Sequence, residues 1–195
     1  NNKKTVWVLK CDIRKFFASV NHSVLKEILK NYISDDKITS LLWVIIDSFS
    51  IQRGTGLPLG NLTSQLFVNV YMNEFDQFIK HKFKAKYYIR YADDFVVMSQ
   101  DKSWLEELLP KIGDFLSENL QLNLHPDKVF IKTLASGVDF LGWVHFPDHR
   151  VLRTVTKRRM LKRIKECKNN EATSQSYRGL LNHGNARKLQ KKRGC

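Results

Sequence analysis

The sequence Tyr91-Ala92-Asp93-Asp94 constrains the fold most, because strand-favouring segments lie on both sides of it. Residues 87–90 and 95–98 are rich in aromatic and β-branched side chains, which are typical of strands. We therefore expect a hairpin over 87–99, with the two aspartates at its tip. Adjacent carboxylates repel each other, and nothing in folding requires this pair. Divalent cations bound between them would reverse the cost of that repulsion.

A third aspartate, Asp12, ends another strand-like segment at residues 5–12. With the hairpin and a fourth strand near 129–131, this strand predicts an α+β fold of the split βαβ (ferredoxin-like) kind, whose antiparallel sheet has the order 4-1-3-2. In that order the end of the first strand and the hairpin tip lie at the same end of the sheet. The topology therefore predicts that Asp12 lies beside Asp93 and Asp94, which suits a two-metal phosphoryl-transfer site.

Helices are expected between these strands from the spacing of apolar residues. Ser23 could cap one of them, and a second follows Ser34. The glycine-rich loop 54–61 permits close approach of its backbone to a ligand, and a long helix follows it. A capping-box pattern at 103–106 opens a further helix, and another strand-like segment covers 138–144.

The net charge of +14 is concentrated in the last quarter of the chain. Residues 1–149 hold 18 basic and 17 acidic side chains, whereas residues 150–195 hold 15 and 2. That helical-looking segment predicts attraction to a polyanion, with strong salt dependence. No apolar run reaches the roughly 18 residues that span a membrane, so no membrane partner is expected. The three cysteines have neither paired nor metal-like spacing, which favours a cytoplasmic setting.

Three converging carboxylates suit Mg²⁺, which prefers oxygen ligands and usually shares substrate phosphates. Two such ions, about 3.5–4 Å apart, can activate an attacking hydroxyl and stabilise a leaving oxygen. The backbone carbonyl of Ile13 could add a ligand. We therefore expect two Mg²⁺ ions as cofactors, with Mn²⁺ as a substitute.

Five segments resemble, in order, the motifs of reverse transcriptases, which are RNA-directed DNA polymerases. Residues 11–17, 56–65 and 91–94 are similar to motifs A, B and C, residues 124–128 to motif D, and residues 140–143 to the primer-grip motif E. The match covers nearly the whole chain. It implies transfer of dNMP from a dNTP to a primer 3′-hydroxyl, with an RNA template and a DNA or RNA primer as partners.

The resemblance implies catalytic, metal-binding roles for Asp12, Asp93 and Asp94, and makes Ile13 a further metal ligand. Lys128 matches the family's candidate general acid for the pyrophosphate leaving group, although an exposed charge without that role is the alternative. The segment Phe140, Leu141, Gly142 and Trp143 would position the primer end, unless Trp143 is simply a core residue.

The same resemblance places a further set of residues at the nucleotide. Phe17 would be the aromatic gate that clashes with a ribose 2′-hydroxyl and so favours dNTPs. At most one of Phe16 and Phe17 faces the nucleotide, because neighbouring side chains diverge, and either could be core. Arg14 and Lys15 would contact the triphosphate, with a position at the surface and no such role as the alternative. Leu59, Gly60 and Gln65 would border the nascent base pair.

Two positions depart from many reverse transcriptases, which have Gln at Leu59 and Pro at Gln65. The form found here resembles the enzymes of bacterial diversity-generating retroelements, in which loss of the polar residue is associated with error-prone copying. An aliphatic side chain cannot hydrogen-bond the incoming nucleotide or the template, so discrimination weakens. A small accessory protein is then a further expected partner. Group II intron maturases and retron enzymes, which more often carry Gln and Pro, are the alternative.

The family places a fingers region before motif A, whereas eleven residues precede Asp12 here. We expect residues 1–149 to form the polymerase palm and 150–195 to begin a basic helical thumb, with the fingers missing upstream. Such a chain is expected to polymerise little by itself. Two other classes compete. A nucleotide cyclase needs neither a primer grip nor a duplex-binding thumb, and a non-catalytic RNA-binding remnant is opposed by the three intact aspartates.

Overall fold

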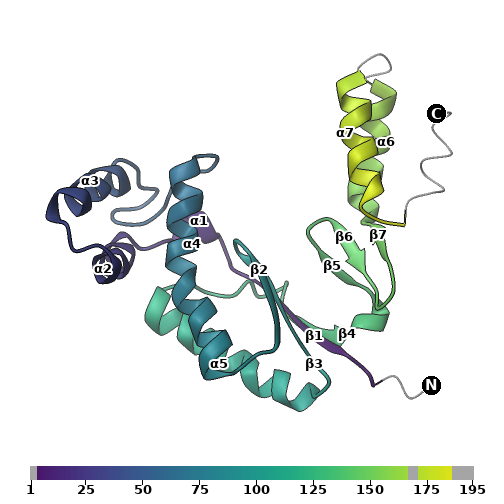
Figure 1. The fold of residues 1–195 in the computed structure, drawn as a ribbon, viewed down its shortest axis with the longest axis horizontal. Coiled ribbons are helices and arrows are strands. Elements are labelled where there is room, and N and C mark those ends of the chain that lie inside the picture. Colours follow the sequence, from purple (N-terminus) through teal and green to yellow (C-terminus); the bar gives the residue numbers. More distant parts are fainter. Residues whose placement is uncertain (1–3, 167–170, 186–195) are drawn as a thin grey trace. The chain divides into compact units, whose positions relative to one another are not determined.

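The computed structural model describes residues 4–166 and 171–185 (Figure 1). Contacts divide the chain into two compact units, one of residues 7–131 and the other of residues 1–6 with 132–195. We describe each unit by itself. The division falls earlier than the palm–thumb boundary expected after residue 149, and the assignment of palm and thumb stays a prediction. Within the described residues, no helix is long and apolar enough to cross a membrane.

A four-stranded sheet in the order β2-β3-β1-β4 lies mainly in the first unit, and its strand β4 continues past the division after residue 131. Its strands are β1 (Trp7–Asp12), β2 (Tyr87–Tyr91), β3 (Asp94–Ser99) and β4 (Phe130–Thr133). β1 pairs antiparallel with β3, and β3 pairs antiparallel with β2. The order is the one that the sequence predicted. The four central residues of β1 are buried, and β1 is an inner strand between β3 and β4.

Helices cover the sheet and connect its strands. They are α1 (Phe16–Ser19), α2 (His22–Tyr32), α3 (Asp36–Asp47), α4 (Leu62–Gln77) with the π-helical turn η1 (Phe78–Lys82), and α5 (Lys102–Leu120). α5 contacts β1, β3 and α4, while α2 contacts α3 and α4. The ring of Phe75 on α4 lies 4.9 Å from that of Phe95 on β3 and 6.0 Å from that of Phe115 on α5. This aromatic cluster joins the sheet to both long helices.

The cap of α2 differs from the one expected, while α3 begins after Ser34 as expected. Asn21, not Ser23, caps α2, because its Oδ1 accepts hydrogen bonds from the backbone of Ser23 and Val24. Asp35 caps α3 in the same way, one residue after Ser34. In both cases an amide or carboxylate oxygen reaches two backbone N–H groups at the open helix end.

The second unit begins with a short 3₁₀ turn, η2 (Leu134–Ser136), and a three-stranded antiparallel meander of β5 (Val138–Phe140), β6 (Trp143–His145) and β7 (Arg150–Leu152). The single strand expected over 138–144 is therefore wrong. Leu141 and Gly142 both have positive φ, of 52° and 81°, and form the two-residue turn of a hairpin.

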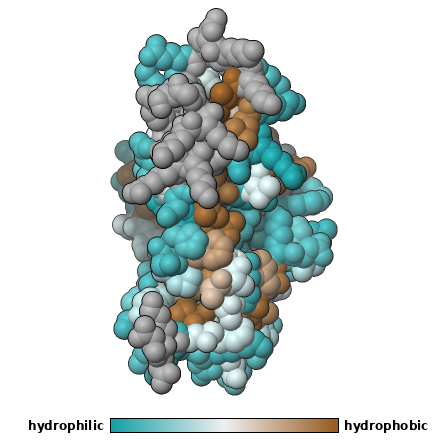
Figure 2. Space-filling model, turned by 90° about the vertical axis from the view of Figure 1, so that its right-hand side faces the viewer, coloured by the Kyte–Doolittle hydropathy of each residue, from teal (hydrophilic) through white to brown (hydrophobic). Residues whose placement is uncertain are grey.

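Two helices, α6 (Thr154–Glu166) and α7 (Glu171–Asn182), complete this unit. A small core of Trp143, Leu152, Met160 and Leu181 joins them to the meander. α6 holds most of the described basic residues of the segment, and the end of the expected basic region lies outside the described residues. Figure 2 shows one face of the molecule, on which hydrophilic residues surround apolar ones.

Candidate active site

Asp12, Asp93 and Asp94 lie at one end of the sheet. Asp12 is the last residue of β1, and its register partner is Asp94, the first residue of β3. The backbone N–H of Ile13 donates a 3.0 Å hydrogen bond to the carbonyl of Asp93. The predicted neighbourhood of the three aspartates is therefore confirmed by the strand register.

The segment that carries Lys128 is held against the end of β1 by backbone hydrogen bonds. The N–H of His125 donates to the carbonyl of Asp12 at 2.7 Å, and the N–H of Arg14 donates to the carbonyl of Asn123 at 2.8 Å. Lys128 Nζ then lies 3.1 and 3.2 Å from the two carboxylate oxygens of Asp12. Motifs A and D are thus joined directly.

A second lysine, Lys10, ion-pairs with Asp94, at 2.7 Å between Nζ and Oδ1. Only 11% of the Lys10 side chain and 21% of the Asp94 side chain is exposed, whereas 54% of the Lys128 side chain is exposed. Sequence reasoning missed Lys10. The available signal was a lysine in the middle of the otherwise apolar segment that leads to Asp12.

We call the end of the sheet that holds Asp12, Asp93 and Asp94 the aspartate corner. Its electrostatics oppose the charged form of two of these carboxylates. Burial raises the pKa of Asp93 above its ordinary value, and the neighbouring Asp12 raises it further. Burial also raises the pKa of Asp94, against the lowering effect of Lys10. Carboxylates in such surroundings gain from a cation that approaches them.

In the described part of the chain, no group of three or more His, Cys, Asp or Glu side chains is arranged so that it could hold a metal ion as it stands. The ammonium groups of Lys10 and Lys128 lie instead against two of the carboxylates. The donor set nevertheless fits a hard divalent cation in its chemistry, because carboxylate oxygens are the ligands that Mg²⁺ prefers.

The two phenylalanines after Asp12 separate as expected. Phe16 is 3% exposed and belongs to the core, while Phe17 is half-buried and meets it edge-on, with 5.5 Å between ring centroids. Of the pair, Phe17 alone keeps exposed surface for a ligand. The N–H of Leu57 donates to the carbonyl of Phe17 at 2.8 Å, so the middle of the loop 54–61 passes beside this residue.

Apart from the two phenylalanines, the residues predicted to contact the nucleotide are exposed. Leu59 is 79% exposed, and Gly60 and Gln65 are also exposed. Ser64, by contrast, is buried in α4. A cavity of about 340 Å³ borders the start of α1, and its lining is Arg14, Lys15, Ala18, Ser19, Ile51, Gln52 and Asn123. Arg14 and Lys15 therefore share one cavity, which is compatible with either of the roles left open for them.

The predicted primer-grip residues form the β5–β6 hairpin of the second unit. Phe140 and Trp143 are register partners, with Leu141 and Gly142 at the turn. Trp143 is only 7% exposed and lies in the small core, so the core alternative applies to its ring. Leu141, at 49% exposed, is the accessible side chain of this turn.

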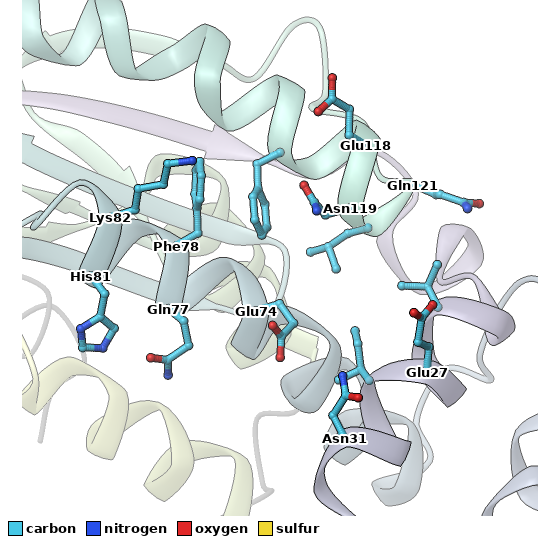
Figure 3. Close-up of a pocket in the computed structure, with 14 residues that line it drawn as sticks. Glu27, Asn31, Glu74, Gln77, Phe78, His81, Lys82, Glu118, Asn119 and Gln121 are labelled. Atoms are coloured by element: carbon cyan, nitrogen blue, oxygen red, sulfur yellow. The ribbon is translucent and has the colours of Figure 1, made fainter.

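A larger groove, of about 640 Å³, lies between α2, α4, η1 and α5. Figure 3 shows the carboxylates of Glu27, Glu74 and Glu118 around it, together with His81 and Lys82. None of the three aspartates lines this groove. Its acid and amide side chains are typical of solvated helix faces, and we assign it no role.

The fold and the aspartate corner define a class of nucleic-acid polymerase, and a family comparison agrees. The sequence model of the family described as reverse transcriptase (RNA-dependent DNA polymerase) matches residues 1–145. The chain therefore belongs to the reverse transcriptase family.

Individual relatives are more distant. Protein YkfC of Escherichia coli (strain K12) is 28% identical, over 75% of this chain and 47% of that protein. The group II intron-encoded protein LtrA of Lactococcus lactis subsp. cremoris is 23% identical, over 78% of this chain and 36% of that protein. The chain thus spans about half, or less, of the length of these curated relatives.

Solved structures show the same fold. A truncated apo telomerase from Candida tropicalis matches with a TM-score of 0.56 at 16% identity, over 80% of this chain and 36% of that one. A telomerase from Candida albicans, in complex with the TWJ fragment of telomeric RNA, matches with a TM-score of 0.57 at 14% identity, over 76% and 30%. At these identities the likeness concerns the fold alone.

Proposed function

We propose that this chain is the catalytic part of an RNA-directed DNA polymerase, which transfers dNMP from a dNTP to a primer 3′-hydroxyl. The observation that carries the proposal is the pairing of Asp12 with Asp94, together with the hydrogen bond from the N–H of Ile13, the residue after β1, to the carbonyl of Asp93. This corner occurs in a chain of the reverse transcriptase family. Clustered carboxylates have a cost in folding, and that cost is explained by a catalytic use.

Asp12, Asp93 and Asp94 would hold two Mg²⁺ ions, or Mn²⁺ in their place, with the carbonyl of Ile13 as a further ligand. When bound, these ions would supply activation of the primer hydroxyl and charge neutralisation on the phosphates. The electrostatics of the three aspartates favour a bound cation, because burial opposes the negative charges on Asp93 and Asp94.

The lysines have separate parts in this proposal. Lys10 neutralises Asp94 from within the sheet. Lys128 neutralises Asp12 and, because half of its side chain is exposed, can turn toward a leaving pyrophosphate and donate a proton to it. Its contact with Asp12 supports a place at the reaction centre over the alternative of an idle surface charge.

Nucleotide selection would fall to the exposed residues beside this corner. Phe17 would exclude a ribose 2′-hydroxyl, while Phe16 supports it from the core. Arg14 and Lys15 would contact the triphosphate, and Leu59, Gly60 and Gln65 would border the nascent base pair. The open position of Leu59 supports contact with a bound nucleotide or template.

We further propose that the four-stranded sheet and its helices are a split βαβ palm within residues 1–149, and that 150–195 begin a thumb. The thumb would track an RNA–DNA duplex through its phosphates and shape, with residues 140–143 near the primer end. RNA template, primer and dNTPs are then the partners. A cytoplasmic setting stays a prediction from the sequence.

The subfamily rests on different observations. Leu59 and Gln65 favour a diversity-generating retroelement, with a small accessory protein as partner. The likeness to a group II intron-encoded protein favours the maturase alternative. The neighbouring genes decide between them, because a template repeat and a variable repeat indicate the first, and a structured intron RNA indicates the second.

The test is dNTP incorporation on a poly(rA)–oligo(dT) duplex by the full-length protein. Asp93→Asn should lower incorporation by at least about a hundredfold, as loss of a group that stabilises transition-state charge typically does. Asp114→Asn is the matched control, because Asp114 is an exposed carboxylate on α5. Equal incorporation by Asp93→Asn and wild type would overturn the proposal. RNA binding without any incorporation would favour the non-catalytic remnant.

A further inference from the structure

A buried polar network links α4 to the strand that precedes the aspartate turn. Asp76, near the end of α4, accepts hydrogen bonds from Arg90 Nε at 2.8 Å and Arg90 Nη2 at 2.6 Å. The hydroxyl of Tyr88 donates to the same carboxylate at 2.6 Å. Only 9% of the Arg90 side chain is exposed. A two-pronged arginine–carboxylate pair of this kind fixes orientation as well as charge.

Arg90 also reaches the turn itself. Its Nη1 donates a 3.2 Å hydrogen bond to the carbonyl of Ala92. Ala92 has φ of 54°, in the left-handed region, which costs a residue other than glycine about 1–2 kcal/mol. Such a conformation persists only where its surroundings hold it in place. Arg90 is one of the groups that hold it.

The two peptide groups that flank Asp93 are therefore both anchored. Arg90 binds the carbonyl of the Ala92–Asp93 peptide, and the N–H of Ile13 binds the carbonyl of the Asp93–Asp94 peptide. One anchor comes from α4 through Asp76, and the other comes from β1. With both planes fixed, the direction of the Asp93 side chain is fixed within its rotamers.

We propose that Arg90 and Asp76 are positioning residues that aim the carboxylate of Asp93 at the metal and substrate. The inference rests on the proposed polymerase function. Among the charges that act on the pKa of Asp93 are those of Asp12, Lys128 and Lys10. Arg90 acts instead through its hydrogen bond to the backbone carbonyl of Ala92. The forked shape of its guanidinium group therefore matters, and a positive charge alone is not enough to hold the turn.

Arg90→Lys separates these two properties, because lysine keeps the charge and lacks the planar fork. Binding of Mn²⁺ to the full-length protein, followed by the loss of the free-ion electron paramagnetic resonance signal, measures the site without catalysis. We expect roughly tenfold weaker Mn²⁺ binding and a similar fall in kcat, the range typical when a group that orients a metal ligand is removed. The KM for dNTP should stay near the wild-type value.

Two control variants distinguish aiming from general destabilisation. Tyr88→Phe removes the hydroxyl that binds Asp76 but leaves the hydrogen bonds of Arg90 to Asp76 and to the carbonyl of Ala92, so Mn²⁺ binding should stay close to wild type. Phe115→Leu weakens the core at the ring that stacks on Phe78, so it should lower Tm without weakening Mn²⁺ binding. If Arg90→Lys does not fold, Asp76→Asn, which keeps the side-chain shape, takes its place with the same expected losses.

The outcomes separate the two proposals. Wild-type Mn²⁺ binding and kcat in Arg90→Lys, within an active enzyme, would overturn the positioning role alone. An equal fall in Mn²⁺ binding in Phe115→Leu would also overturn it, because the effect would then follow stability. A wild-type protein that neither binds Mn²⁺ nor incorporates dNMP would overturn the proposed function and the positioning role with it.

Discussion

Removal of one partner of the ion pair between Lys10 and Asp94 is expected to destabilise the fold strongly, because the pair is largely buried and the remaining charge would be left without its partner. Its Nζ and Oδ1 lie 2.7 Å apart, with 11% and 21% of the two side chains exposed. Lys10→Met keeps the apolar stem and removes the ammonium group. Asp94 is then left beside Asp12 and Asp93, both of which raise its pKa.

The free energy of unfolding that Lys10→Met loses can be estimated from the burial of the ion pair. Removing one partner of a fully buried pair costs about 3–5 kcal/mol, while exposed pairs contribute about 0–1 kcal/mol. Since Asp94 retains some exposure, we expect Lys10→Met to lose about 2–3 kcal/mol of the free energy of unfolding. For a chain of this size that corresponds to a fall in Tm of roughly 4–12 °C.

The chain contains a matched control. Lys102 and Glu106 on α5 form an ion pair with the same 2.7 Å separation, but their side chains are 44% and 50% exposed. Lys102→Met should therefore cost at most about 1 kcal/mol. Urea unfolding followed by circular dichroism measures both losses. A double-mutant cycle with Asp94→Asn isolates the energy of the Lys10–Asp94 pair from other contacts of Lys10.

The pH dependence adds an independent check. The pKa of Asp94 is already raised, and removal of Lys10 takes away an effect that lowers it. Protonation removes the negative charge of Asp94. The loss in free energy of unfolding caused by Lys10→Met should therefore shrink as the pH falls through the raised pKa of Asp94, and it should return at higher pH. Equal losses for Lys10→Met and Lys102→Met, with no such pH dependence, would refute the argument from burial.

Three further predictions concern the site. Asp93→Asn should raise Tm in the presence of a chelator, because burial and Asp12 oppose the charge of Asp93; a lower Tm contradicts this. Phe17→Ala should raise rNTP relative to dNTP incorporation by about tenfold, whereas Phe16→Ala should lower stability by about 3–5 kcal/mol without that change; unaltered sugar selection in Phe17→Ala excludes the gate. Leu59→Gln should raise fidelity, and unchanged misincorporation opposite template adenine counts against its role.

Much of the fold could be predicted because its signals are local. The aromatic and β-branched residues on both sides of Asp93 and Asp94 predicted the hairpin, and the strand order brought Asp12 to its tip. The cap of α2 was harder to predict, since Asn21 and Ser23 lie two positions apart and both residue types are common helix caps. The turn at Leu141 was missed because a leucine at positive φ has no propensity signal.

The sequence by itself determined the strand and helix types, the aspartate motif and the family, because each depends on residues close together along the chain. Only the tertiary structure decided which charges meet. Lys10 bonds a residue 84 positions away, Lys128 one 116 positions away, and Arg90 the end of a preceding helix. Such pairs depend on distances in space after the sheet and helices pack, and the spacing of residues along the chain does not contain them.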